Sequence, residues 1–138
     1  MSEPDWTEQG IGWWEALRRG DMDAAVALAH PDLEIHIGPG FPFAVTEAQG
    51  AERFRRLWGG MQESFESFEL EPEELSDEGG GIGLATIRFH ARGAGSGAEV
   101  TGRFYFVGLF REGRLARGEM YLDREDTAAA VARLGQAG

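Results

Sequence analysis

Arg88 and His90 stand two residues apart in the stretch IGLATIRFHAR (82–92), where apolar and polar side chains alternate. Alternation with a period of two predicts a strand, and it places both side chains on one face together with Thr86. An arginine can bind an anionic or carbonyl oxygen, and a histidine can transfer a proton near neutral pH. We therefore predict Arg88 and His90 as catalytic residues and Thr86 as a ligand contact. The alternative is that Arg88 and His90 lie at a solvated strand end or in a dimer interface.

A second candidate for acid chemistry is Asp123 in the stretch GEMYLDRED (118–126), which precedes an alanine-rich segment. Alternation puts Gly118, Met120 and Leu122 on one apolar face and leaves Asp123 on the polar face. An aspartate directly before a helix commonly caps its first turn. We interpret Asp123 as the cap of a final helix, with catalysis as the alternative, and we predict that Met120 faces the interior.

Metal and cofactor chemistry have little support in the sequence. The chain has three histidines, none of them paired at metal-ligand spacing, and no cysteine. The glycine-rich stretch GGGIG (79–83) lies between two predicted strands, whereas a phosphate-binding loop joins a strand to a helix. We therefore predict no metal and no cofactor.

Composition limits the classes of partner. A net charge of −11, from 24 acidic and 13 basic residues, argues against nucleic acid. No apolar run approaches the ~20 residues that span a bilayer, and the first residues, MSEPDWTEQG, lack the pattern of a signal peptide. A length of 138 residues suits one core. We expect one domain, 1–138, in the cytoplasm, without a nucleic-acid or membrane partner.

Hydrophobic periodicity predicts the elements that position these residues. They are helices over 6–19, 22–29 and about 48–65, a strand over 33–37, a loop over 38–50, strands from 67 and over 82–92, 99–111 and 114–122, and a short final helix after Asp123. Helices segregated from antiparallel strands indicate an α+β fold. We predict a cone-shaped, curved antiparallel sheet, a type of α+β barrel, with about three N-terminal helices in its concave face.

The strand over 99–111 is apolar on both faces, since Tyr105, Val107 and Leu109 alternate with Phe104, Phe106 and Phe110. The filling of the cone would cover one face. A sheet that exposes several aromatic side chains is unfavourable in a monomer. We therefore predict that a second subunit covers the other face in a homodimer.

Four stretches resemble the SnoaL-like branch of the nuclear transport factor 2-like superfamily: WWEALRRGDMDAAVALAHPDLEIHI, GAERFRRLW, GAGSGAEVTGRF and FREGRLARGEMYLDRED. The resemblance implies a cone of curved sheet with a pocket, and dimerisation through the sheet. The superfamily includes polyketide cyclases, epoxide hydrolases and isomerases. Its cyclases and epoxide hydrolases carry a catalytic aspartate on the last strand, which corresponds here to Met120. The arginine and aspartate of its epoxide hydrolases correspond to positions near Thr86 and Arg88, and the pair is not reproduced.

Two functions follow from these features. The first is a pocket protein for a small apolar or carbonyl-containing ligand, which it binds or converts by cofactor-free isomerisation, cyclisation or hydration. The predicted ligand-binding residues are Trp14, Ile35, Ile37, Phe54, Trp58, Thr86 and Met120. The alternative is a non-catalytic homodimeric binding or accessory module, in which Phe54, Trp58, Met61 and Phe65 fill the cone.

Overall fold

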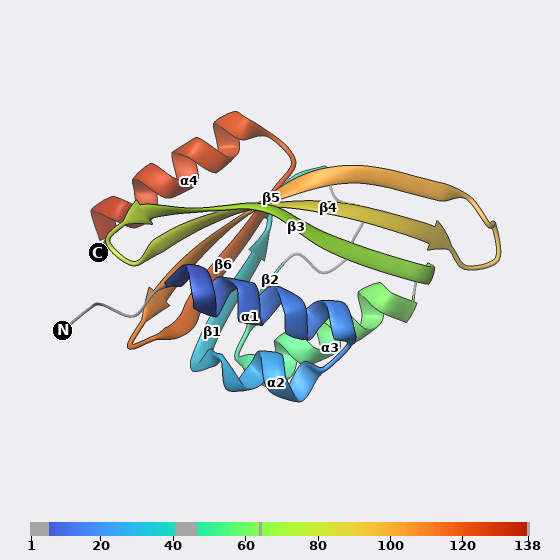
Figure 1. The fold of residues 1–138 in the computed structure, drawn as a ribbon, viewed down its shortest axis with the longest axis horizontal. Coiled ribbons are helices and arrows are strands. Elements are labelled where there is room, and N and C mark those ends of the chain that lie inside the picture. Colours follow the sequence, from blue (N-terminus) through green and yellow to red (C-terminus); the bar gives the residue numbers. More distant parts are fainter. Residues whose placement is uncertain (1–5, 41–46, 64, 138) are drawn as a thin grey trace.

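The computed structural model describes residues 6–40, 47–63 and 65–137, which form helices on both sides of one sheet (Figure 1). In chain order the elements are α1 (Trp6–Arg19), α2 (Met22–Ala27), β1 (Ala29–Ile37), β2 (Glu47–Gln49), α3 (Ala51–Glu63), β3 (Phe65–Gly79), β4 (Ile82–Gly93), β5 (Glu99–Arg111), β6 (Arg114–Tyr121) and α4 (Arg124–Ala137). The predicted α+β class and element order are confirmed. The predicted loop over 38–50 contains β2, and its residues 41–46 lie outside the described part.

The sheet is mixed, which corrects the prediction of purely antiparallel strands. Its order is β2-β1-β6-β5-β4-β3, so that it remains open between β2 and β3. Strands β3 to β6 form the predicted antiparallel meander. Strand β1 pairs in parallel with β6 and places Ile37 beside Met120. Alternation in the sequence identifies β1 as a strand, but it carries no information about the direction of a partner so distant in the chain.

Two element boundaries differ from the prediction. Helix α2 ends at Ala27, and β1 already begins at Ala29. Residue 48, predicted to start the third helix, belongs to β2, and Phe65 belongs to β3. The alanine and glutamate residues at these places favour a helix locally, but pairing with neighbouring strands overrides that preference.

The sheet buries both faces in the region of β5. Helices α1, α2 and α3 cover the concave face, whereas α4 lies against the opposite, outer face (Figure 1). The buried cluster on the concave side, the concave core, consists of Trp13, Trp14, Ala16, Leu17, Ala25, Ala29, Leu33, Ile35, Ile37, Ala48, Phe54, Trp58, Leu70, Ala85, Ile87, Phe104, Phe106, Leu115 and Met120. The cluster under α4, the outer core, consists of Ile82, Val107, Leu109, Tyr121, Ala130 and Leu134. Helix α4 therefore covers the apolar outer face for which we predicted a second subunit.

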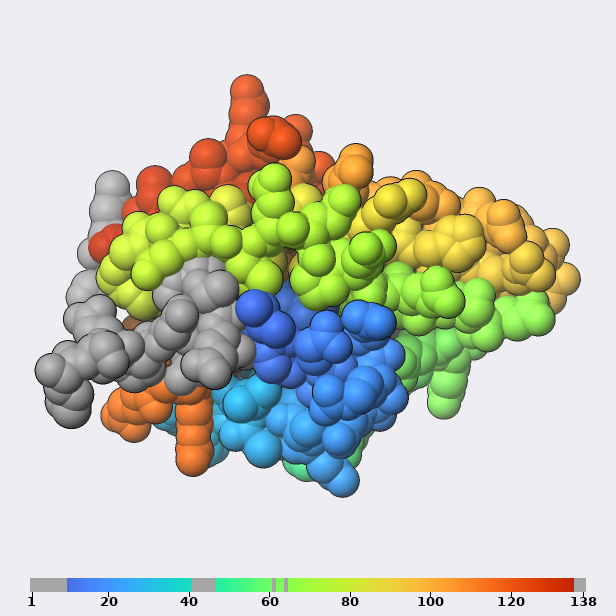
Figure 2. Space-filling view, viewed as in Figure 1, coloured from blue at the N-terminus to red at the C-terminus, as the bar shows by residue number. Residues whose placement is uncertain are grey.

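The helices leave one end of the sheet bare. The joined ends of β4 and β5 project beyond α1, α3 and α4, as the ribbon and the space-filling view both show (Figures 1 and 2). No helix in the described residues is long and apolar enough to cross a bilayer.

Candidate functional site

Met120 lies in the concave core, as alternation predicts. Its side chain is 5% exposed, and it stands opposite Phe106 in the β5–β6 register. The preceding inward position is Gly118, where a Cβ atom would lie 2.5 Å from the ring of Phe106. The chain therefore places a thioether, which cannot transfer a proton, where the resemblance implies a carboxylate.

A row of aromatic rings fills the concave face. The ring centroids of Trp13 and Phe54 are 5.1 Å apart, those of Phe54 and Trp58 are 6.1 Å apart, and those of Trp58 and Phe68 are 5.8 Å apart. Trp14 packs edge-to-face on Phe106 at 5.1 Å. Such pairs add to the stabilisation from burial. The buried polar or charged residues of the described part are Glu119 and Thr127, and neither belongs to the concave core.

A small void lies among described residues on the concave side. A void of about 10 Å³ lies among Gly10, Trp13, Trp14, Leu75, Gly83, Ala85, Phe106, Gly108 and Phe110. This is about the volume that one water molecule requires. A ligand in this region would therefore have to displace or rotate the surrounding rings.

A larger and more open hollow of about 720 Å³ lies beside the edge strand β3, and we call it the edge hollow. Its lining residues are Arg18, Phe68, Glu69, Leu70, Glu71, Arg88, Phe89, His90 and Thr101. Leu70 belongs to the concave core, and Phe68 and Phe89 pack against it. On β4, Arg88 and His90 stand on either side of the inward-facing Phe89 in the sequence, so their side chains point to the outer face of the sheet. The edge hollow thus brings the two predicted catalytic residues close to the margin of the apolar interior.

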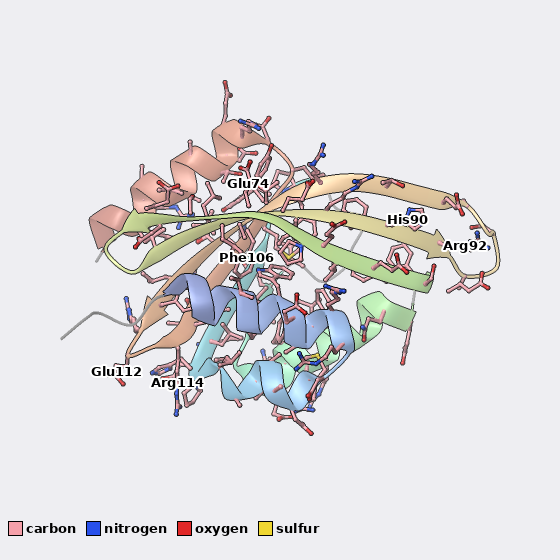
Figure 3. All side chains as sticks on the ribbon, in the orientation of Figure 1. Glu74, His90, Arg92, Phe106, Glu112 and Arg114 are labelled. Atoms are coloured by element: carbon pink, nitrogen blue, oxygen red, sulfur yellow. The ribbon has the colours of Figure 1, made fainter. Side chains whose placement is uncertain are left out.

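The structure separates the predicted site residues into two groups. Trp14, Ile35, Ile37, Phe54, Trp58 and Met120 all belong to the concave core. Thr86, Arg88 and His90 lie on the other side of β4, because Ala85 and Ile87 are the buried inward residues. Figure 3 shows Phe106 on the side of α1, Glu74 on the side of α4, and His90 near the projecting end of β4.

Thr86 lines a groove of its own under α4. This groove has a volume of about 350 Å³ and is lined by Glu74, Glu78, Leu84, Thr86, Tyr105, Arg124, Thr127, Ala128 and Val131. The Arg124 Nε–H donates to the Tyr105 hydroxyl at 2.9 Å. Thr86 therefore lines a different hollow of the described structure from the one that Arg88 and His90 line.

His90 lies within hydrogen-bond distance of a side chain on the neighbouring strand. Its Nδ1 atom lies 3.0 Å from Oγ1 of Thr101 on β5. The described residues contain no group of three His, Cys, Asp or Glu side chains that could hold a metal ion.

Asp123 caps α4, which confirms the interpretation as a helix cap. Its exposed carboxylate accepts the backbone N–H of Glu125 at 2.6 Å. Its backbone carbonyl accepts both the N–H of Thr127 at 3.1 Å and the Thr127 hydroxyl at 2.7 Å. The side chain is thus engaged at the start of α4, away from the concave core.

Asp123→Ala is expected to lower the free energy of unfolding by ~1 kcal/mol, because it leaves an N-terminal N–H of α4 without its acceptor. Asp123→Asn, which retains a side-chain acceptor, is the matched control and should lose much less. Urea unfolding followed by circular dichroism measures both. Equal losses in the two variants would show that the cap does not stabilise α4.

The sequence reasoning missed a buried ionic cluster on the outer face, which we call the Glu119 cluster. Glu119 is fully buried and accepts hydrogen bonds from Tyr121, from Arg133 of α4 and from Arg117, the last at 2.6 Å. Arg117 also donates to Glu34 at 2.7 Å. In the sequence, the polar faces of the strands contain Glu34, Arg117, Glu119 and Tyr121, and their pattern is the same as that of exposed residues. The one signal that could have indicated a buried ion pair is a basic residue in the final helix, Arg133.

The hydrogen bonds of the Glu119 cluster keep its carboxylate ionised. Burial alone would raise the pKa of Glu119, but the hydrogen bonds from Arg133, Tyr121 and Arg117 lower this pKa to about 2. Burial and the neighbouring carboxylate raise the pKa of Tyr121 to about 12. A carboxylate that stays ionised and fully engaged is poorly suited to transfer protons, so we assign the Glu119 cluster to the attachment of α4.

Comparison with known proteins agrees with this architecture. A family model described as the SnoaL-like domain matches residues 11–118, and the chain therefore belongs to the SnoaL-like family. No curated protein matches the chain. Residues of the Glu119 cluster from 119 onward lie beyond the matched segment.

Solved structures with the same fold share little sequence with the chain. An NTF2-like protein from Burkholderia thailandensis E264 is 21% identical, with a TM-score of 0.78, over 94% of this chain and 98% of that chain. An NTF2-like protein of unknown function from Burkholderia pseudomallei K96243 is 19% identical, with a TM-score of 0.77, over 95% and 98%. TerC, co-crystallised with polyporic acid, is 16% identical, with a TM-score of 0.75, over 91% and 97%. At these identities the similarity establishes the fold alone.

Proposed function

We propose that the protein binds a small, largely apolar molecule against its concave face without performing acid–base chemistry there. The observation that carries this proposal is that Met120 occupies the inward position of β6, while the buried polar or charged residues of the described part, Glu119 and Thr127, lie outside the concave core. Binding sites for small molecules are typically lined by such side chains. Proton transfer would require a titratable group within reach of the ligand, and the buried carboxylate of the described part, Glu119, lies outside the concave core.

The edge hollow is the natural entrance to this site. Phe68 lines the hollow and also contacts Trp58 of the concave core, with 5.8 Å between the ring centroids. Rotation of Phe68 would join the open hollow to the aromatic row. TerC, which has the same fold, was co-crystallised with polyporic acid, and this supports ligand binding as a use of the fold.

The proposal can be tested with the neutral fluorescent probe N-phenyl-1-naphthylamine. We expect saturable binding with one site per chain, and about five- to tenfold weaker binding in Phe68→Ala, because the variant loses an aromatic wall. Arg88→Ala changes the outer side of the same hollow, and its affinity for the probe should stay within twofold of that of the native protein. No saturable binding, or a loss in Arg88→Ala as large as in Phe68→Ala, would contradict the proposed site.

A second candidate function is acid–base catalysis by Arg88 and His90. It is favoured by the presence of both side chains in the edge hollow, next to Phe68 and Leu70. A ligand with a carbonyl oxygen could meet Arg88 there while His90 exchanges a proton. Turnover of carbonyl and epoxide compounds that is lost in Arg88→Ala and His90→Ala would support this function over simple binding, and unchanged turnover in both variants would exclude these residues from the site.

The homodimer stays a prediction. One reason for predicting it was an uncovered apolar face of β5. That reason no longer applies, because Ala130 and Leu134 of α4 cover Val107 and Leu109 of β5. The exposed large apolar side chains among the described residues are Ile11, Val100 and Leu122, which do not belong to one element. Light scattering would support the dimer with a mass of twice 15.1 kDa and would contradict it with a mass of 15.1 kDa.

A further inference from the structure

Two buried hydrogen-bond donors in the concave core have no acceptor among the residues that the structure describes. The indole Nε1 atoms of Trp13 and Trp58 are buried without a hydrogen-bond partner in the described part of the chain, and both side chains are only 2% exposed. A third such atom, Nε of Arg55, belongs to a guanidinium whose Nη2 lies 2.8 Å from Asp23 near the surface. Buried N–H groups are nearly always paired in native proteins, so the two indoles require an explanation.

The two donors lie along the same aromatic row. Trp13 comes from α1 and Trp58 from α3, and both rings pack against Phe54, at centroid distances of 5.1 and 6.1 Å. Trp13 also lines the void of about 10 Å³. Trp58 contacts Phe68 at the edge hollow. The two indole rings therefore lie where a molecule entering from the edge hollow would pass between the helices and the sheet.

We propose that the N–H groups of Trp13 and Trp58 recognise a neutral oxygen acceptor on the ligand, such as a ketone or ether oxygen on a ring system. This inference rests on the proposed function and adds its polar specificity. An indole donates a hydrogen bond but cannot accept one, so the ligand must supply the acceptor. The acceptor is neutral because the described residues include no buried cation: the buried polar or charged ones are Glu119 and Thr127, so an anion in the concave core would lack a counter-charge.

The inference can be tested with 9-fluorenone and fluorene, which are nearly the same in shape and differ by one carbonyl oxygen. Equilibrium dialysis should show that the native protein prefers fluorenone by about three- to tenfold, the range that one hydrogen bond typically gives. In the double variant Trp13→Phe/Trp58→Phe, which keeps two aromatic rings but removes both N–H groups, the ratio of the two affinities should fall to about one. The two single variants identify which donor the carbonyl uses.

The outcomes separate this inference from the proposed function. If neither compound binds, the concave site itself is contradicted. If both bind equally well to the native protein, the site stands and the inference fails, because the indole N–H groups then only face neighbouring rings. The inference also fails if the preference for fluorenone persists in the double variant. Should the double variant not fold, persistence of the preference in both single variants has the same meaning.

Discussion

Glu119→Ala is expected to lower the free energy of unfolding by about 3–5 kcal/mol, one of the largest effects of any single substitution in this chain. The substitution leaves Arg117 and Arg133 without their shared carboxylate and removes the acceptor of the Tyr121 hydroxyl. It also loosens α4, because Arg133 is the residue of that helix that reaches Glu119. Denaturant unfolding monitored by circular dichroism and tryptophan fluorescence measures the effect.

An exposed ion pair provides the matched control. Glu99 accepts from Arg92 at 2.7 Å, but both side chains are about half exposed. Glu99→Ala should therefore lower the free energy of unfolding far less than Glu119→Ala does. If Glu99→Ala and Glu119→Ala proved equally costly, burial would not be what makes the Glu119 cluster strong.

The contribution of Glu119 should also depend on pH in a defined window. Its pKa is about 2 in the folded protein and 4.5 ordinarily, so the unfolded chain binds more protons between these values. The stabilisation is complete above pH 4.5 and is lost as the pH falls toward 2. The difference in unfolding free energy between the native protein and Glu119→Ala should therefore shrink over this range, whereas a constant difference would mean that the carboxylate has an ordinary pKa.

Met120→Asp is the second substitution for which we expect a large effect, a loss of about 3 kcal/mol or more. The position is 5% exposed, and an aspartate there would be a buried carboxylate with no cationic partner in the concave core. Met120→Leu, which conserves volume and polarity, should cost less than about 1.5 kcal/mol. Thermal unfolding at pH 7 of the two variants tests the difference.

This comparison bears on function as well as stability. If Met120→Asp were as stable as Met120→Leu, water or a polar group would have to reach the inner end of β6. The concave face could then support acid–base chemistry after all. The expected instability of the aspartate variant is therefore a consequence of the apolar interior on which the proposed binding function depends.

Periodicity in the sequence was sufficient to predict most of the fold. The helical stripe of α3 and the alternation in β4 and β5 each depend on neighbours within a few residues, which is why they can be recognised locally. Strand β2 has only three residues, and β1 pairs with a strand about 80 positions later in the chain. Neither feature has a local signal, so the mixed character of the sheet could be established only from the structure.

The face of β4 was harder to interpret than its existence as a strand. Ile82 and Leu84 are apolar and Arg88 and His90 are polar on the same face of this strand. In the structure, Ile82 and Leu84 lie under α4, and the strand then projects beyond that helix. The change in polarity thus follows the end of the cover that α4 provides. The Glu119 cluster could not be recognised from the sequence either, because its members come from three different elements, β1, β6 and α4.

A crystal structure of the protein soaked with fluorene tests the central claim most directly, because this hydrocarbon can be held only by apolar contacts. The account predicts fluorene density between the sheet and the α1–α3 layer, in contact with Phe54 and Trp58, with Phe68 rotated toward the edge hollow. Fluorene bound only in the groove under α4, or only on the outer face beside Arg88 and His90, would contradict it.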